Sequence, residues 1–465
     1  MPITSKRAPT PGRDPLVFVR RLLLVTALLT LSVPATADGA TRWVVKGGGW
    51  GHGLGMSQYG AYGQALDGRG YRKILHHYYR HTRFGNAGGT VRVLLLASVG
   101  SSTFGGADRV GSHNIRPGNN YTVRRVGSHI VVRSPRGKRI ARTSGVLRVL
   151  SPNGLVTVAG KGVYRDVIEY RPGLSGGVTA VNKVALENYI RGVVPNESPG
   201  SWPIEALKAQ AVAARSYALG TGGGNRIFDH YDTVASQVYG GYSSEQAKTN
   251  RAVARTRGEV LRSGGKVIVA YFHSTSGGHT ENNENIFTGG APLPYIRGVP
   301  DPWDKTSPYH RWRVGYSARS LGGALGVGRL RSVRVNKRGV SSRIVYATFR
   351  GSGGRVRLHG WNGIRARLVL RDAPSTFKRI TSRGATASAA VAGVGSRARA
   401  RDVVGTVAPG DRGDRVSVQR HTRSGWKRVA EGRLRRSGRY RVALRAAGRY
   451  RVVTGGDAGP AVRVR

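Results

Sequence analysis

Short runs of alternating apolar and polar residues, separated by glycine, asparagine and proline, fill most of the chain and constrain its fold more than any other feature. Between residues 90 and 170 these runs read VRVLLLAS, YTVRRV, HIVVRS, GVLRVL and GLVTVAG. Such alternation is typical of strands with one buried face, and the 69 glycines favour frequent turns. We therefore expect short strands joined by turns, with no long heptad repeat.

Two helical segments interrupt these strand-like runs. The first, VNKVALENYIRGVV, has Asn182 as a candidate N-cap and carries its apolar side chains on one face. The second, PIEALKAQAVAARSYAL, has Pro203 and Glu205 in its first turn and alanines along its length. We expect both helices to pack closely around the loop PNESPGSW that joins them. Together with the strands they predict an α+β fold, β-rich with a helical subregion.

Changes in composition along the 465 residues predict a main domain, a signal before it, and a linker and a small module after it. Two arginines, a short apolar run and a small-residue site predict an export signal over residues 1–37, because the apolar run is too short to span a membrane. The main domain is expected over 38–385. A stretch rich in Ala, Gly, Ser and Arg predicts a linker at 386–403. Alternating runs then predict a small, basic, β-sandwich-like module at 404–465.

The formal charge of +53 indicates that the protein binds polyanions. Nucleic acid is one candidate partner, and a phosphate-bearing wall polymer or a lipid headgroup layer is the other. The export signal favours the extracellular polyanion. We therefore expect a secreted, cell-wall-associated protein that binds no nucleic acid. The absence of cysteine excludes disulfides, thiolate metal ligands and a thiol nucleophile.

Glu197 is the candidate catalytic group. Without cysteine, a G-x-S-x-G elbow or an H-E-x-x-H motif, the remaining options are carboxylate, serine or histidine chemistry. Glu197 is expected in a loop walled by two packed helices, where partial desolvation raises the pKa of a carboxyl and suits it to general-acid catalysis. A glutamate on a solvated surface loop is the alternative.

Long and dissimilar motifs occur in order along residues 43–377. They are GWGHGLGMSQYGA, VNKVALENYIRGVVPNESPGSWPIEALKAQAVAARSYAL, DTVASQVYGGYSSE, VIVAYFHSTSGGHTENNENIF and YIRGVPDPWD. In these motifs the chain resembles the stage II sporulation protein D (SpoIID/LytB) family. The resemblance implies a lytic transglycosylase that cleaves MurNAc–GlcNAc bonds in cell-wall glycan, preferably in strands stripped of stem peptides. A non-catalytic wall protein that enhances a cell-wall amidase is the alternative role attached to this family.

The resemblance implies that Glu197 acts as both acid and base. It protonates the glycosidic oxygen and then takes a proton from the sugar's own primary hydroxyl, which closes an anhydro ring. A hydrolytic glycosidase normally needs a second carboxylate, and the nearby carboxylates have weaker claims: Glu187, Glu205, Asp229 and Asp232. The implied substrate-binding residues are Arg215, Tyr217, Gln237, Tyr239, Ser274 and Ser276. Hydrogen bonding within the core is the alternative for each of these six.

The GHGxGMSQ segment stands at an unusual place in the chain. In the family it lies near the C-terminal end of the domain, after a segment similar to LHGWNGIRARLVLRDAPSTF, which ends here at Phe377. We therefore predict a circular permutation that has moved residues 43–85 in front of the main part, 90–377. This requires Trp43 and Phe377 to lie close in space.

On this view the opening stretch forms the rim of the active site. Its aromatic residues can stack on sugar rings; they are Trp50, Tyr59 and Tyr62. Its candidate polar contacts are His52, Ser57 and Gln58. A phosphate loop is not predicted, because no GK[ST] follows the glycines. His52, His273 and His279 are available as metal ligands, but some family members use a cysteine in their metal site. We therefore expect no metal and no cofactor.

Overall fold

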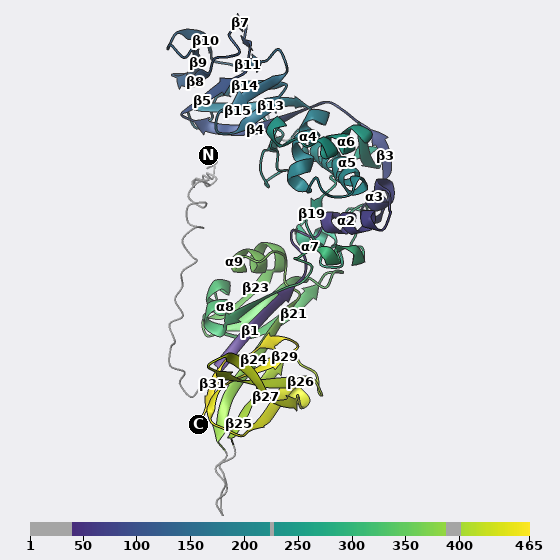
Figure 1. The fold of residues 1–465 in the computed structure, drawn as a ribbon, viewed down its shortest axis with the longest axis vertical. Helices are drawn as coiled ribbons and strands as arrows, with labels where there is room; N and C mark the ends of the chain where they lie inside the picture. The colour runs from purple at the N-terminus through teal and green to yellow at the C-terminus, as the bar shows by residue number, and fades with distance from the viewer. Residues whose placement is uncertain (1–39, 224–226, 387–400) are drawn as a thin grey trace, which may run out of the picture.

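The computed structural model describes residues 40–223, 227–386 and 401–465. It shows an elongated molecule in which a helical region lies between β-rich parts (Figure 1). The mixture of helices and strands confirms the predicted α+β class. The predicted export signal, residues 1–37, lies outside the described residues. Within the described ranges no helix is both long and apolar enough to cross a membrane.

Two mostly antiparallel sheets between residues 90 and 231 pack around the largest hydrophobic core. The first contains, in spatial order, β16 (His230–Tyr231), β4 (Thr90–Val99), β15 (Val178–Ala185), β14 (Val167–Pro172), β11 (Leu147–Leu150), β6 (Arg109–Val110) and β7 (His113–Asn114). The second contains β10 (Arg139–Thr143), β9 (His129–Arg133), β8 (Tyr121–Val126), β5 (Ser101–Gly105), β12 (Leu155–Val158) and β13 (Gly162–Arg165). Val93 and Tyr170 of the first sheet share the core with Val123 and Val132 of the second.

Helices gather in the middle of the molecule (Figure 1). They are α2 (Gln58–Leu66), α3 (Tyr71–Tyr78), α4 (Leu186–Glu197), α5 (Ile204–Thr221), α6 (Ala247–Arg255), α7 (Asn283–Ile286) and the short 3₁₀ helices η1 (Tyr242–Ser244) and η2 (Pro302–Thr306). Short strands lie beside them: β2 (Met56–Ser57) pairs with β19 (Phe272–His273), and β3 (Arg83–Asn86) with β17 (Glu259–Ser263), which also pairs with β18 (Lys266–Val267). Helix α5 confirms the predicted alanine-rich helix. Its buried alanines, such as Ala209 and Ala213, let α3, α4 and α6 pack closely against it.

The start of α4 differs from the prediction. Strand β15 continues to Ala185 and α4 begins only at Leu186, so Asn182 is a strand residue and not an N-cap. The strand persists because β15 pairs with β14 on one side and β4 on the other. The Asn182 amide also donates to two carbonyl oxygens where β13 meets β14. At its other end α4 includes Glu197, which is the last residue of the helix and not part of a loop.

A five-stranded sheet brings the two ends of the main domain together. Its order is β20 (Trp312–Ser317), β1 (Ala40–Gly47), β24 (Thr376–Thr386), β25 (Arg401–Ala408) and β28 (Arg439–Leu444). In the antiparallel pair β1–β24, Val45 lies opposite Phe377, and Trp43 belongs to the same hydrophobic cluster. This is the proximity that the predicted permutation requires, while the permutation itself stays a prediction.

A three-stranded sheet lies beside this one and packs on the same cluster. It consists of β21 (Leu330–Arg338), β22 (Ile344–Gly351) and β23 (Gly354–His359), and its neighbours are α8 (Ala318–Leu325), the π-helical turn η3 (Gly360–Arg365) and α9 (Ala366–Leu368). Phe349 and Leu358 point into the core that contains Trp43.

The C-terminal strands share a sheet with the main domain. Strand β25 pairs along its length with β24, so the predicted boundary between 38–385 and 404–465 crosses a continuous sheet. The predicted linker, 386–403, is shorter at both ends, because Thr386 still belongs to β24 and β25 already begins at Arg401. Its remaining residues lie outside the described part of the chain.

A second C-terminal sheet covers β25 and β28. It contains β27 (Gly425–Arg433), β26 (Arg415–Thr422), β29 (Gly448–Thr454) and β30 (Asp457–Ala458), with β31 (Val462–Val464) also on β29 and η4 (Arg436–Gly438) before β28. The two sheets enclose a core in which Val44 and Ile380 of the main domain meet Val418 and Val452.

Candidate active site

Glu197 lies at the C-terminal end of α4, and its side chain is half-buried. Its Oε1 accepts a hydrogen bond from the Val238 backbone N–H at 2.9 Å, and its Oε2 accepts one from Gln58 Nε2 at 3.4 Å. Burial raises the pKa of the Glu197 carboxyl, and the two hydrogen bonds oppose this rise because they favour the ionised form. The net direction is upward, which keeps the carboxyl available as a proton donor.

Gln58 joins the opening glycine-rich stretch to this carboxyl. Its Nε2 also donates to the backbone oxygen of Glu197 at 2.9 Å and lies 3.4 Å from Gln210 Oε1 on α5. Ser57 is the N-cap of α2, where its Oγ accepts from the Gly60 N–H at 3.1 Å. Both side chains are buried. Gln58 therefore orients Glu197, and Ser57 fixes the helix start that carries Gln58.

Tyr217 lies near the acid and belongs to a group of aromatic side chains. The Tyr217 ring on α5 lies 5.9 Å from the Tyr271 ring and 6.1 Å from the Phe272 ring, and all three are half-buried. Burial raises the pKa of Tyr217, and the neighbouring charges of Tyr271 and Glu197 raise it further. Tyr217 is therefore a neutral phenol near Glu197, able to donate or accept a hydrogen bond.

Ser274 contacts the start of α2, which also carries two aromatic residues. Ser274 is half-buried, and its carbonyl oxygen accepts a hydrogen bond from the Tyr59 N–H at 3.0 Å. The rings of Tyr59 and Tyr62 pack against Trp202, in the loop after α4, at centroid distances of 5.2 and 4.9 Å. The opening stretch thus borders the loop that follows Glu197.

Trp50 is the exposed aromatic residue of the GWGHG stretch, with 43% of its surface accessible. Its backbone N–H donates to the Thr275 carbonyl at 2.9 Å, and its ring meets the Tyr309 ring edge-on at 4.4 Å. A large ring held by its backbone and open to solvent suits stacking on a sugar face.

Arg215, a predicted binding residue, is instead part of a buried ion pair. Its guanidinium is fully buried and donates to both carboxylate oxygens of Glu187, at 2.8 and 2.9 Å. A third N–H donates to the Glu259 carbonyl at 3.0 Å. The guanidinium therefore has no surface to offer a substrate, and it holds α5 against α4.

Gln237 and Tyr239 are likewise enclosed by the core. The Gln237 side chain is fully buried and accepts a hydrogen bond from the Tyr189 hydroxyl at 3.1 Å. The Tyr239 hydroxyl donates to Asn182 Oδ1 at 2.7 Å. Neither side chain reaches a substrate surface. They fix the backbone on either side of Val238, whose N–H binds Glu197.

The other carboxylates considered beside Glu197 each have a cationic partner. The pairs are Glu187 with Arg215, Glu205 with Lys208, Asp229 with Arg92 and Asp232 with Lys161, at 2.7 to 2.8 Å. An opposite charge at this distance favours the ionised form of a carboxyl. Among these five carboxylates and within the described ranges, Glu197 alone lacks a cationic partner.

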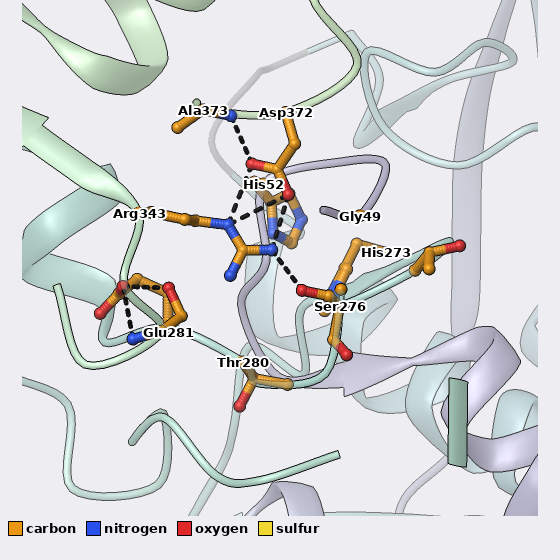
Figure 2. A network of polar contacts seen from close by, with 12 residues as sticks. Gly49, His52, His273, Ser276, Thr280, Glu281, Arg343, Asp372 and Ala373 are labelled. Carbon is orange, nitrogen blue, oxygen red and sulfur yellow. Dashed lines mark hydrogen bonds and ion pairs between the residues drawn. The ribbon is translucent and has the colours of Figure 1, made fainter. Parts of the chain in front are cut away.

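A second polar cluster lies beside the glycine-rich stretch and is centred on a buried ion pair (Figure 2). The Arg343 guanidinium donates to both oxygens of Asp372, and its remaining N–H groups donate to the carbonyl oxygens of Ser276 and His279. Ser276 Oγ donates to Asp304 at 3.1 Å. Ser276, a predicted substrate-binding residue, is therefore buried, and its hydroxyl already has a hydrogen-bond partner within the protein.

Gly49 explains part of the glycine content of the opening stretch. It has a φ of +93°, and a Cβ at this position would lie 2.7 Å from Asp372 Oδ2 and 2.5 Å from the Thr275 carbonyl oxygen. Only glycine allows the backbone to approach the ion pair this closely.

His52 and His273 lie next to this ion pair and are held neutral. Burial lowers the pKa of His52 to about 4, with a further contribution from the Arg343 charge. Burial also places the pKa of His273 well below its ordinary value. The two ring centroids are 5.6 Å apart, and His279 Nδ1 contacts the Thr280 carbonyl at 2.6 Å. Throughout the described ranges, no three histidine or carboxylate side chains are grouped to hold a metal ion.

Sequence reasoning missed Arg343, Asp372 and Asp304. Asp304 belongs to the YIRGVPDPWD motif, so its membership in a family motif was an available signal. Asp372 belongs to the family-like segment LHGWNGIRARLVLRDAPSTF, whereas Arg343 lies outside every quoted motif. The pairing itself had no signal, because the two residues are 29 positions apart in the chain.

Two cavities in the lower half of the molecule lie away from Glu197. One, of about 310 Å³, is lined by residues of β1, α8, β21 and β24 and the segment before β21, and the other, of about 440 Å³, by residues of β24, β25 and β28. Neither is lined by a carboxylate or a histidine, so neither offers a group for acid–base chemistry. The candidate active site is therefore at Glu197 and not at either of these cavities.

Part of this chain is similar in sequence to known proteins. A family model described as Stage II sporulation protein matches residues 174–262. Stage II sporulation protein D of Bacillus amyloliquefaciens is 33% identical over 222 residues, which cover 43% of this chain and 62% of that protein. Its counterpart in Bacillus subtilis is 35% identical over 165 residues, 32% of this chain and 48% of that protein.

A relative with a different name is also similar to part of this chain. The amidase enhancer of Bacillus subtilis is 42% identical over 132 residues, 28% of this chain and 17% of that protein. The chain therefore spans less than two thirds of the length of these curated relatives. The segment matched by the family model contains α4, α5 and Glu197. These matches show that residues 174–262 carry a domain of the family described as Stage II sporulation protein, and that part of the chain is similar to stage II sporulation protein D.

Proposed function

We propose that this chain is a secreted lytic transglycosylase that cleaves MurNAc–GlcNAc bonds in cell-wall glycan, without a metal or cofactor. The family and its named relatives support a role in the cell wall. The observation that carries the finer proposal is the Glu197 carboxyl, half-buried, raised in pKa and free of cationic partners among the described residues. A carboxyl in this environment can hold a proton and deliver it to a leaving oxygen.

The reaction needs one carboxyl in two successive roles. Protonated Glu197 donates its proton to the glycosidic oxygen, and the bond from that oxygen to the muramic acid anomeric carbon breaks. The resulting Glu197 carboxylate accepts the proton of the same sugar's primary hydroxyl, whose oxygen forms the new bond to the anomeric carbon. The proton count is restored, no water is consumed, and the product ends in an anhydro ring.

The surroundings of Glu197 fit this alternation. The Val238 N–H and Gln58 Nε2 stabilise the carboxylate stage, while partial burial stabilises the protonated stage. A hydrolytic glycosidase would require a second free carboxylate to activate water. The carboxylates nearest in sequence are each paired with an arginine or lysine, which favours the ring-closing route.

Incubation with peptide-free glycan strands tests this proposal. The wild-type protein is expected to release anhydromuramic ends, and Glu197→Gln is expected to lower the rate by about 100- to 10,000-fold. Glu205→Gln is the matched control, because it changes a half-buried carboxylate in the next helix that already pairs with Lys208. Equal rates for Glu197→Gln and the wild type would overturn the assignment.

Enhancement of a wall amidase is the second candidate, favoured by the 42% identity to the Bacillus subtilis amidase enhancer. In that case Glu197→Gln would stimulate a purified wall amidase as strongly as the wild type, and neither protein would create new glycan ends. The same glycan digestion, repeated with an amidase and intact peptidoglycan, separates the two roles.

A further inference from the structure

We propose that the outer face of the sheet β21–β22–β23 binds a phosphate-bearing anionic wall polymer. The proposal rests on the wall location proposed above, but not on the chemistry of Glu197. Figure 1 shows this sheet in the lower half of the molecule, apart from α4 and α5. It would therefore serve as a docking surface separate from the catalytic residue.

The two faces of this sheet differ sharply in composition. The inner face packs against the hydrophobic cluster through Val333, Phe349 and Leu358. Because strand side chains alternate between faces, the residues between these point outward: Ser332, Arg334, Tyr346, Thr348, Arg350, Arg355 and Arg357. The three strands contain no aspartate or glutamate.

The strand register places these arginines in cross-strand rows. Arg350 lies directly opposite Arg355, and Thr348 lies between Arg334 and Arg357. Like charges placed opposite each other destabilise a sheet. All four arginines are exposed, and in the described part of the chain none forms an ion pair. Among the described residues no carboxylate offsets the repulsion between these arginines, whereas an anionic ligand would offset it.

The side chains favour phosphate over other anions. A guanidinium binds a phosphate through two parallel N–H···O bonds, whereas a lysine acts as a point charge. Neighbouring strands lie about 4.8 Å apart and alternate residues along a strand about 6.7 Å apart. Four arginines on such a grid fit a chain of repeated phosphates better than one isolated ion.

The residues between the arginines favour a polyol phosphate over nucleic acid. Single-stranded nucleic acid is bound through aromatic platforms on which the bases stack. The outer face offers two rings at one edge, Tyr346 and His359, which lie 5.2 Å apart and pack on each other. The Arg357 guanidinium already lies over Tyr346 at 4.7 Å, and His359 Nε2 contacts the Asn285 carbonyl oxygen. The Thr348 hydroxyl donates its proton to Asn336 Oδ1 at 2.8 Å, so its oxygen can still accept a hydrogen bond from a polyol hydroxyl. The Tyr346 hydroxyl can donate or accept one.

The test compares two sets of charge-removing substitutions of equal size. The face variant changes Arg334, Arg350, Arg355 and Arg357 to Gln. The control variant changes four exposed arginines of the upper β-rich part to Gln: Arg109, Arg124, Arg136 and Arg139. The probe is a synthetic glycerol-phosphate oligomer with a fluorescent end, and anisotropy gives the Kd at fixed salt. We expect the face variant to lose at least about tenfold in affinity, with a shallower salt dependence, and the control variant to lose less than about threefold.

Three results would overturn the proposal. Equal losses in both variants would mean that binding follows net charge and not this face. Tighter binding of an oligonucleotide of equal charge, lost only in the face variant, would make the partner a nucleic acid. Tighter binding to anionic vesicles than to the oligomer, lost only in the face variant, would make the partner a membrane surface.

Two further measurements keep the result interpretable. The face variant is expected to melt no lower than the wild type, because the substitutions relieve repulsion. Should it melt lower, Arg355→Gln alone replaces it, with a smaller but still selective loss of affinity expected. Glu197→Gln is expected to bind the oligomer normally, so loss of glycan cleavage and loss of docking can be distinguished.

Discussion

At the level of single residues, the pKa of Glu197 determines how activity should depend on pH. The proposed acid must be protonated in the free enzyme, and burial raises its pKa above the ordinary value of 4.5. We therefore expect kcat/KM on peptide-free glycan to be highest at acidic pH and to fall as the pH rises through that raised value. A descending limb at or below pH 4.5 would contradict the environment described for Glu197.

The same shift predicts an effect on stability. A carboxyl whose pKa is higher in the folded than in the unfolded state keeps a proton that the unfolded chain releases. The wild type therefore loses stability as the pH rises from the unfolded value through the folded one. Glu197→Gln does not titrate, so its free energy of unfolding should improve relative to the wild type between pH 4 and pH 7. Urea unfolding at both pH values measures this, and an unchanged difference would be the contrary result.

At the level of elements, the contact between α4 and α5 depends on the Arg215–Glu187 pair. Removing the carboxylate leaves a fully buried guanidinium without its partner. Glu187→Gln should therefore lower the free energy of unfolding by about 3 kcal/mol. Glu431→Gln, which breaks the exposed pair with Arg428, should cost about 0.5 kcal/mol or less. Urea unfolding measures both losses of unfolding free energy. Similar losses in the two variants would show that the buried Arg215–Glu187 pair does not stabilise the contact between α4 and α5.

These elements also show what local sequence can predict. Helix α5 was predictable because its alanines and the Pro203 start act locally. The strand around Asn182 was not, because its conformation depends on pairing with β4 and β14, which lie elsewhere in the chain. A second difference lies at the other end of α4, where Glu197 is the last helical residue and not part of the predicted loop. Its proximity to α5 was predicted.

At the level of the whole molecule, the continuous sheet β20–β1–β24–β25–β28 makes the C-terminal strands part of the main domain's core. A chain ending at residue 386 would expose Val44 and Ile380 and leave β24 with an open edge. We expect such a chain to melt at a lower temperature and to aggregate in light-scattering assays. Melting at the full-length temperature would mean that residues 401–465 fold as an independent module.

Contacts between segments that are distant in the sequence could be predicted only in part. The resemblance led to the opening stretch and to Glu197, and Gln58 now joins the two. It did not reveal the Arg343–Asp372 pair, which forms only when distant segments meet beside Gly49. Nor did it separate the buried Arg215, Gln237 and Tyr239 from residues with a free surface, because burial is a property of the assembled fold.

The chemistry assigned to Glu197 is tested most directly by the ends of the glycan that the protein produces. Peptide-free strands would be digested in water enriched in heavy oxygen, and the fragments weighed by mass spectrometry. We predict muramic ends that are lighter by one water than a hydrolysed end and that carry no heavy oxygen. Reducing muramic ends that contain one heavy oxygen would show hydrolysis, and with it a water-activating group that the single-carboxyl mechanism does not include.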